Sequence, residues 1–341
     1  MRALVTGGAG FIGSHMVKTL LDFGHEPVVL DDMSCGHRDA VPPGVPFVLG
    51  DVASTADVAA LLRDQRIDVV FHFAAKIRVE QSVTEPRLYW KGNVVATLAL
   101  LDAVLDSGRV KAFVQSSTAA VYGTPEETLI DEEHPKRPVN PYGETKLAIE
   151  RALEAYGHAP GLRRAALRYF NAAGADHEAG LGERHEPETH LVPIVLEVAA
   201  GQRASLAIYG TTWPTPDGTC VRDYVHVSDL CEAHLAAVEH LLRGGECGAF
   251  NLGTGQGHSV REIVEAARTI TGLPIATVDA PPRAGDPAVL VAKVERAAQV
   301  LGWRAKRAAL SRIVGDAWAW KRRAPASASL LPAKDLGAPR E

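Results

Sequence analysis

The sequence predicts an α/β fold, in which a doubly wound parallel sheet is followed by a smaller C-terminal lobe. Three observations favour it. Short apolar runs alternate with longer amphipathic stretches, a glycine-rich turn joins the first run to the first stretch, and the composition changes after Phe170. The chain has 341 residues, which is enough for two domains or for one large core with a lobe.

The apolar runs have the length of buried strands, and the stretches between them have the length and periodicity of helices. Because strands and helices alternate, the sheet is expected to be parallel and covered on both faces. The expected strands are Arg2–Thr6, Pro27–Leu30, Pro46–Leu49, Val69–Phe73, Ala112–Gln115 and Arg163–Tyr169. The expected helices are Phe11–Phe23, Thr55–Gln65, Asn93–Ser107 and Tyr142–Tyr156, the last of which is capped by Asn140-Pro141 and ends at Gly157.

The second half of the chain has a different texture. Residues 174–222 are rich in Gly, Pro and polar side chains, which predicts loops over a ligand. Tyr224–Arg243 is expected to form a strand and a helix, and Ala249–Gly253 another strand, both returning to the large domain. The expected division is therefore 1–173 with 223–256 for the large domain, 174–222 with 257–322 for the lobe, and a disordered tail over 323–341 that is rich in Ala, Pro and Ser.

Composition and charge exclude several classes of protein. The net charge of −5 provides no basic footprint, so nucleic acid is not an expected partner. There is neither a signal-peptide pattern nor an apolar run of about 18 residues, so no membrane association is expected. The histidines show no metal-ligand spacing, and no metal is expected. Cys35, Cys220, Cys231 and Cys247 form no CxxC pair, which fits reduced thiols in the cytoplasm.

The first turn carries a dinucleotide-binding pattern. Gly7, Gly10 and Gly13 form a GxxGxxG motif between the first strand and the first helix. Glycines allow the tight turn and the close approach of a pyrophosphate, which then faces the positive end of the helix. Asp31 ends the second strand, where a carboxylate binds ribose hydroxyls and favours NAD over NADP. The motif predicts a Rossmann-type sheet that binds NAD.

A second pattern points to acid/base chemistry. Tyr142 and Lys146 lie four residues apart on one expected helix and so share a face. An unperturbed tyrosine has a pKa near 10, and a neighbouring ammonium and a positive nicotinamide would favour the phenolate. Ser116, Ser117 and Thr118 follow a strand, where ligands bind in parallel α/β sheets. Taken separately, a surface helix pair and turn capping would also explain these two motifs.

These motifs together resemble the extended short-chain dehydrogenase/reductase superfamily. Tyr169-Phe170-Asn171 and the long segment 205–227, which contains PTPDGT, VRDY and HV, are similar to the UDP-glucose 4-epimerase (UDP-galactose 4-epimerase) family. The resemblance covers residues 1 to about 320, with the motifs in family order. It implies a fold with a UDP-sugar-binding lobe, NAD as the cofactor, a UDP-hexose as the substrate and a homodimer.

The resemblance also implies roles for particular residues. Thr118, Tyr142 and Lys146 are the implied catalytic group. The implied cofactor site consists of Gly7, Gly10, Phe11, Ile12, Gly13, Asp31, Asp51, Val52, Phe73, Ala74, Ala75, Asn93, Ser116, Tyr142, Lys146 and Tyr169. The implied substrate site consists of Thr118, Asn171, His190, Leu191, Ala207, Tyr209, Arg222, Arg283, Asp286 and Leu290.

The arginines agree with this assignment, since a diphosphate calls for guanidinium groups. A surface ion pair Arg222-Asp223 and a charged loop at 283–286 are the alternative interpretations. The chain departs from the family pattern at Thr118, where members often have Ser, at Gly92-Asn93, where members often have Asn-Asn, and at His190, where some have Asn. Lys76 is not assigned to the cofactor site, and His72 and His226 are expected to be packed or hydrogen-bonded.

The expected reaction is redox-neutral. Tyr142 takes the proton of the sugar 4-hydroxyl while hydride leaves C4, the 4-keto sugar rotates about the diphosphate, and hydride returns to the opposite face. Thr118 orients the hydroxyl, and Lys146 lowers the tyrosine pKa. A UDP-pentose or UDP-uronate 4-epimerase and a non-catalytic NAD-sensing protein are the alternatives. Ala119-Ala120 argues against a 4,6-dehydratase, which needs an acid there.

Two further expectations concern substrate choice and assembly. Leu290, four residues after Asp286, stands where a tyrosine disfavours N-acetylated sugars in the family, so UDP-N-acetylhexosamines are expected as additional substrates. The helices 93–107 and 142–156 are expected to pair across a dimer, with Leu98, Leu101 and Leu105 as an apolar stripe.

Overall fold

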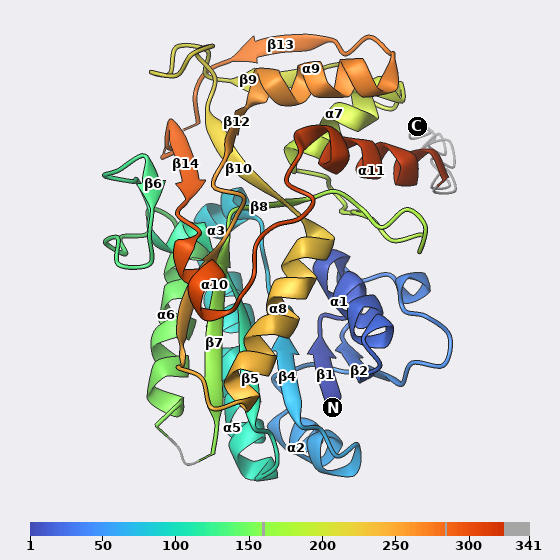
Figure 1. Cartoon of the computed structure of the whole chain (residues 1–341), viewed down its shortest axis with the longest axis vertical. Coiled ribbons are helices and arrows are strands. Elements are labelled where there is room, and N and C mark those ends of the chain that lie inside the picture. Colours follow the sequence, from blue (N-terminus) through green and yellow to red (C-terminus); the bar gives the residue numbers. More distant parts are fainter. Residues whose placement is uncertain (159–160, 284, 324–341) are drawn as a thin grey trace, which may run out of the picture.

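The computed structural model describes residues 1–158, 161–283 and 285–323. The tail expected to be disordered lies outside these residues, apart from Arg323. The larger part of the molecule is a seven-stranded sheet in the order β11-β7-β5-β4-β1-β2-β3, with all neighbouring strands parallel (Figure 1). The strands are β1 (Arg2–Thr6), β2 (Glu26–Asp31), β3 (Phe47–Leu49), β4 (Val69–His72), β5 (Ala112–Thr118), β7 (Arg163–Tyr169) and β11 (Gly248–Leu252).

Helices cover both faces of this sheet, as the alternating pattern predicts. One face packs on α1 (Phe11–Asp22) and α8 (Val227–Leu242) through a core that contains Val114, Leu167 and Val238. The opposite face packs on α2 (Thr55–Asp64), α5 (Ala96–Ser107) and α6 (Pro141–Tyr156). The helix α6 starts as predicted, with the Asn140 side chain accepting a hydrogen bond from the Gly143 amide at 2.9 Å and Pro141 in the first turn.

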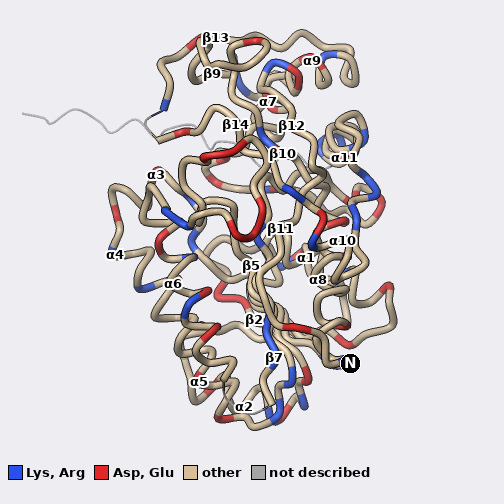
Figure 2. Tube along the Cα trace, turned by 60° about the vertical axis from the view of Figure 1, so that its left-hand side comes forward, with Lys and Arg blue, Asp and Glu red and all other residues tan. Residues whose placement is uncertain are grey.

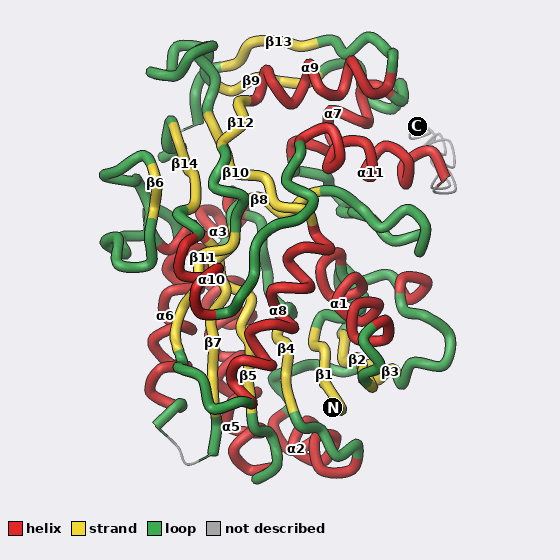
Figure 3. Tube along the Cα trace, in the orientation of Figure 1, coloured by secondary structure: helices red, strands yellow, loops and turns green. Residues whose placement is uncertain are grey.

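The lobe has its own sheet and core at the carboxyl end of the large sheet (Figure 3). Its helices are α7 (Leu191–Ala199), α9 (Val260–Thr271) and α11 (Leu310–Arg323), and α10 (Glu295–Val300) lies beside β11. Its strands are β6 (Leu129–Ile130), β8 (Asn171–Ala173), β9 (Leu206–Tyr209), β10 (Val221–His226), β12 (Gly257–Ser259), β13 (Thr277–Ala280) and β14 (Val289–Ala292). Short helical turns lie at η1 (Arg38–Ala40) and η3 (Ala119–Val121).

Three sequence-based expectations need correction. The strand β10 was expected in the large sheet, but it pairs with β8, β12 and β14 in the lobe. The other two elements lie as expected, since β11 pairs with β7 and α8 packs on the large sheet. Residues 174–222 are not all loop, because α7 is apolar around most of its surface and fills the core of the lobe. Leu101 does not belong to an exposed stripe, since it is fully buried in the chain's own core.

Between β4 and α5 the chain forms helices that the pattern did not predict: α3 (Val79–Thr84), α4 (Pro86–Tyr89) and a π-helical segment η2 (Trp90–Val95). By length and composition alone, the combined helix Pro86–Ser107 could cross a membrane, although 44% of its most apolar window is buried inside the molecule. It packs on α2 and α6, as core helices of α/β proteins do. Lys and Arg are dispersed along the trace among Asp and Glu (Figure 2).

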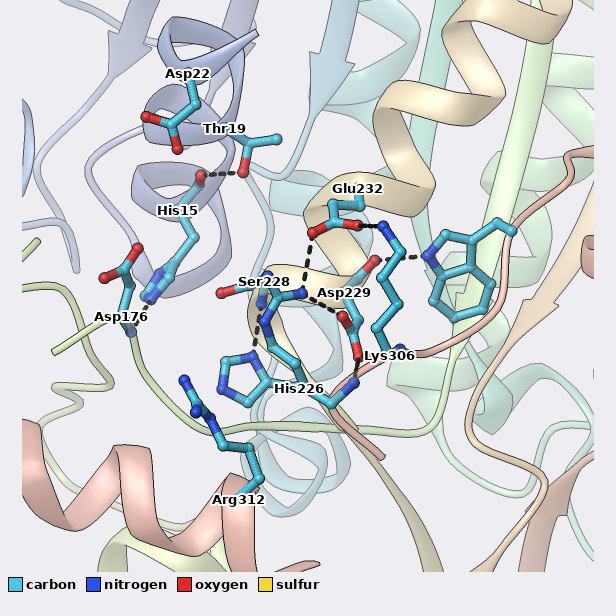
Figure 4. Close-up of polar contacts among 12 residues, drawn as sticks. His15, Thr19, Asp22, Asp176, His226, Ser228, Asp229, Glu232, Lys306 and Arg312 are labelled. Atoms are coloured by element: carbon cyan, nitrogen blue, oxygen red, sulfur yellow. Dashed lines mark hydrogen bonds and ion pairs between the residues drawn. The ribbon is translucent and has the colours of Figure 1, made fainter. Parts of the chain in front are cut away.

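Polar contacts fasten the lobe to the large domain (Figure 4). The buried carboxylate of Asp229, in the first turn of α8, accepts hydrogen bonds from the backbone amides of Lys306 and Arg307 at 3.0 and 2.7 Å. On the other side, the amide of Asp176 lies 3.2 Å from Nε2 of His15 on α1. Because these groups are buried and bonded, the two parts of the chain are held in one arrangement.

Candidate active site

The glycine-rich turn leaves the start of α1 open to a ligand. Gly7 has φ of +70°, and a Cβ atom on it would lie 2.7 Å from the Ala74 amide nitrogen, so no larger residue fits this turn. The helix begins at Phe11 without a side-chain cap and without an acidic residue in its first turn. Its amides and positive end are therefore suited to an anion such as the pyrophosphate of a dinucleotide.

Asp31 holds the same turn from the end of β2. Its Oδ2 accepts a hydrogen bond from the Ala9 amide at 2.9 Å, and its Oδ1 accepts one from the Met33 amide at 2.9 Å. Each carboxylate oxygen keeps a lone pair for a ribose hydroxyl. The remaining residues expected at the cofactor lie at the carboxyl ends of neighbouring strands, with Asp51 and Val52 after β3 and Phe73, Ala74 and Ala75 after β4.

Replacing Asp31 by Ala is expected to reduce the NAD that copurifies with the protein and to weaken discrimination against NADP. The change removes the carboxylate that is expected to bind the ribose hydroxyls, together with the hydrogen bond that positions Ala9. Asp32→Ala is the matched control, because Asp32 is exposed and its carboxylate bonds only the Ser34 amide among the described residues. Absorbance of the purified proteins measures cofactor content, and equal content in both variants would contradict the assignment.

The structure brings Tyr142, Lys146, Thr118 and Ser116 together at the carboxyl end of β5. Thr118 ends the strand, and its hydroxyl lies beside the phenol of Tyr142, which is partly buried at the start of α6. The Lys146 Nζ atom donates to the Ser116 carbonyl at 2.9 Å. The Ser116 hydroxyl is in turn hydrogen-bonded to the phenol of Tyr169 on β7, the neighbouring strand.

Burial dominates the electrostatics of this group. It raises the pKa of Tyr142 to about 12, against the hydrogen bond from Thr118, and it lowers the pKa of Lys146 to about 8. Lys146 was expected to lower the pKa of Tyr142. In the protein without its cofactor it does not, because its ammonium group points to the Ser116 carbonyl. The phenolate must therefore be favoured by a positive charge that arrives with the cofactor.

Three positioning residues were missed from sequence. The hydroxyl of Ser82 on α3 accepts a hydrogen bond from the Tyr142 amide at 3.2 Å. Glu150 lies one turn beyond Lys146 on α6 and forms a buried ion pair with Arg168, at 2.6 Å between Nη2 and Oε2. The Tyr142, Lys146, Glu150 spacing of four was an available signal, because it places all three on one face of a helix. Asn93 was expected at the cofactor, and its amide group bonds the backbone of Lys76 at 2.7 and 3.0 Å.

The residues expected to hold the substrate lie on the lobe strands that face this edge. Arg222 on β10 forms an ion pair with Asp286 at 3.4 Å, and the Arg283 guanidinium lies 4.0 Å from the centre of the Tyr209 ring. The alternative Arg222-Asp223 surface pair is wrong, since Asp223 is buried and bonds the turn at Thr254 and Gly255. Asn171 begins β8, Ala207 lies on β9, and His190 and Leu191 begin α7.

Two histidines outside the catalytic group are bonded as expected. The buried ring of His72 lies between the Thr6 and Thr97 hydroxyls, at 2.6 and 2.9 Å. Nδ1 of His226 accepts a hydrogen bond from the Ser228 amide at 3.1 Å. Both rings are therefore structural.

The parallel sheet, the open helix start and the threonine, tyrosine and lysine gathered at the carboxyl end of β5 define an enzyme of the short-chain dehydrogenase type that uses a nicotinamide dinucleotide. The chain belongs to the NAD dependent epimerase/dehydratase family, whose model matches residues 3–253. It is 48% identical over 325 residues to a protein of Halalkalibacterium halodurans named UDP-glucose 4-epimerase, covering 95% of this chain and 97% of that one.

Solved structures are similar over the same length. UDP-glucose 4-epimerase from Brucella ovis in complex with NAD has a TM-score of 0.90 at 46% identity, covering 93% of this chain and 97% of that chain. UDP-glucose 4-epimerase from Bifidobacterium longum in complex with NAD+ and UDP has a TM-score of 0.89 at 36% identity, covering 95% of this chain and 99% of that chain. The large sheet and the lobe are thus both shared with these enzymes.

Proposed function

We propose that this enzyme interconverts UDP-glucose and UDP-galactose by transient oxidation at C4 of the sugar. The observation that carries the proposal is the juxtaposition of Thr118, Tyr142 and Lys146 at the carboxyl end of β5, the same end of the sheet at which the glycine-rich turn follows β1. The names of the similar enzymes support the same substrate pair.

The chain's own residues account for the proton transfer. Tyr142 takes the proton of the 4-hydroxyl and returns it to the product, which makes it the general base and then the general acid. Thr118 bonds the phenol and orients the sugar hydroxyl. The bound NAD supplies the hydride acceptor and donor at C4. Lys146, held on the Ser116 carbonyl, is positioned for the nicotinamide ribose.

The lobe anchors the nucleotide so that the sugar can turn. Arg222 on β10 forms an ion pair with Asp286, and Arg283 lies three residues before Asp286 in the segment that leads to β14. Guanidinium groups bind diphosphates through paired hydrogen bonds. The Arg283 guanidinium stacks on the Tyr209 ring, and together the two side chains form a flat surface on which the uracil base can lie. Most binding energy therefore goes to UDP, which leaves the hexose free to present either face.

The test is to incubate the purified protein, without added NAD, with UDP-glucose, UDP-galactose, their N-acetyl forms and UDP-xylose, and to separate the products. Conversion of UDP-glucose and UDP-galactose into each other is expected, because the cycle regenerates NAD+. Exclusive conversion of UDP-xylose would make the enzyme a UDP-pentose epimerase. No conversion of any sugar by NAD-loaded protein would leave only a binding function.

Leu290 is proposed as a gate for the C2 substituent of the sugar. It lies on β14 opposite Arg222 and packs against the hydrophobic cluster that contains Ala119, the residue after Thr118. A leucine leaves more room there than a tyrosine, so slower but measurable epimerisation of UDP-N-acetylglucosamine is expected. Leu290→Tyr should suppress this reaction and spare UDP-glucose. Equal slowing of both substrates, measured as kcat/KM, would contradict the gate.

We infer that two copies pair through the combined helix Pro86–Ser107. Large apolar side chains on it are exposed, among them Trp90 at 43% and Val95 at 56%, and Leu105 of the expected stripe is exposed at 39%. Exposed apolar side chains that lie along one helix often mark a site of protein–protein association. A dimer at micromolar concentration is expected by light scattering, and Val95→Asp should shift it toward monomer. A monomeric wild-type protein would refute the pairing.

A further inference from the structure

Four potential metal ligands converge on the segment that leads into α7, away from the catalytic tyrosine. They are Glu183, His185, Glu188 and His190, and each offers one nitrogen or oxygen atom within 4.8 Å of the others. The cluster had no counterpart in the sequence expectations, because its ligands are spaced two, three and two residues apart in a loop. Two carboxylates and two imidazoles form a donor set that suits zinc.

The distances between these donors approach those of a tetrahedral site. With metal bonds of 2.0–2.2 Å, the donors of such a site lie about 3.3 Å apart. Here Glu183 Oε1 lies 3.2 Å from His185 Nδ1. Glu188 is near both histidines: its Oε2 lies 3.8 Å from His185 Nδ1, and its Oε1 lies 3.6 Å from His190 Nδ1. The fourth pair, Glu183 with His190 at 2.6 Å, would have to widen by less than about 1 Å.

The surroundings hold the donors in place and leave them available. The Nδ1 atoms of His185 and His190 are buried, and both point at Oε1 of Glu183. Oε1 of Glu188 accepts hydrogen bonds from the backbone amides of Thr189 and His190, at 2.8 and 2.9 Å. These bonds orient the carboxylate and leave its Oε2 atom available to a ligand. Donor atoms that converge on one point and are held by their surroundings are suited to a cation.

Charge and access also fit a divalent cation. Two glutamates balance its two positive charges, and Glu183 is almost fully buried, where an unpaired carboxylate is costly. Glu183, His185 and Glu188 line a cavity of about 560 Å³ between α7 and α11, which provides a route of entry.

We propose that Glu183, His185, Glu188 and His190 bind one zinc ion. Four protein ligands leave no open position, so the ion is structural: it fixes the loop before α7. The same loop contacts the turn after β2, since Arg184 forms a bidentate pair with Asp39 at 2.6 and 3.0 Å. His190 is then a metal ligand, and its side chain is not a uridine contact. The site is independent of the proposed reaction.

The test uses the full chain with its cofactor, stripped of metal by a chelator that is then removed. Titration with Zn²⁺ against a chromophoric chelator is expected to show one tight site per chain, and Co²⁺ is expected to give the intense visible absorption of a tetrahedral complex. His185→Ala and Glu183→Gln should each weaken zinc binding by more than the roughly 10–100-fold typical of losing a group that merely orients a ligand.

His258→Ala is the matched control, because His258 also lies beside a glutamate, Glu262, at 3.6 Å but outside the cluster. It should leave the affinity unchanged. Should the cluster variants fold poorly, X-ray absorption of the zinc-loaded wild type decides the question, with two imidazole nitrogens and two carboxylate oxygens at about 2.0–2.2 Å expected. Absence of a stoichiometric site, sulfur ligation, or equal binding by the His185→Ala variant would overturn the proposal and leave a cluster of ion pairs.

Discussion

Tyr142→Phe is expected to lower kcat by about 10²–10⁴-fold, the usual contribution of a general acid/base group, while UDP still binds. The phenol lies beside Thr118, and its removal takes away the proton acceptor without touching Arg222 or Arg283 on the lobe. Product analysis with UDP-galactose measures turnover, and calorimetry with UDP measures binding.

Tyr156→Phe is the matched control on the same helix. Its hydroxyl donates to Asp102 Oδ1 at 2.6 Å, and it lies nearly four turns from Tyr142, so turnover should stay near the wild-type value. Retention of more than half of the wild-type activity by Tyr142→Phe would remove this residue from the catalytic group. A parallel loss of UDP affinity would indicate a folding defect in place of a chemical one.

Glu150→Gln is expected to lower the free energy of unfolding by about 3–5 kcal/mol, the range for breaking a buried ion pair. The side chains of Arg168 and Glu150 are only 4% and 8% exposed, and Glu150 also bonds the Ser117 hydroxyl. The amide keeps the size of the carboxylate but leaves the guanidinium without a counter-charge. Denaturant unfolding followed by circular dichroism provides the measurement.

The double variant Glu150→Leu with Arg168→Met separates charge from packing. Replacing both partners by apolar groups of similar volume is often neutral, so it should be far more stable than Glu150→Gln. If both variants lose the same stability, hydrogen bonding and packing, and not the uncompensated charge, hold this part of the sheet. Glu150 also favours the charged form of Lys146, so a lower pKa of Lys146 is expected in either variant.

The sheet could be predicted because its signals are local. Each strand of the first half is a short apolar run, and β7 has the predicted bounds, Arg163–Tyr169. The lobe was harder, because α7 is apolar around most of its surface and its sequence lacks a polar stripe to mark a helix. Whether β10 joins one sheet or the other depends on partners far along the chain, which local patterns do not encode.

The active site shows the same division. The glycine turn, Asp31 and the Tyr142, Lys146 pair carry local motifs, and the structure gathers them at one edge of the sheet. Glu150 shares the four-residue spacing of Tyr142 and Lys146, but its role depends on the ion pair with Arg168 on β7, and the ligands around Glu183 lie in an irregular segment. The motif predicts a lowered pKa for Tyr142, whereas the pKa is raised in the protein chain alone. The reason is desolvation, which a motif does not reveal and which outweighs the effect of the neighbouring groups.

The large sheet is completed late in the sequence, and this has a consequence for synthesis on the ribosome. The face of β5 and β7 that packs on α8 includes Val114 and Leu167, and both α8 and the edge strand β11 come from residues 227–252. When β7 has emerged, the nascent chain therefore carries an uncovered apolar surface that no upstream helix can bury. At about 5–20 residues per second this exposure lasts several seconds. We expect the emerging chain to depend on chaperones during that interval.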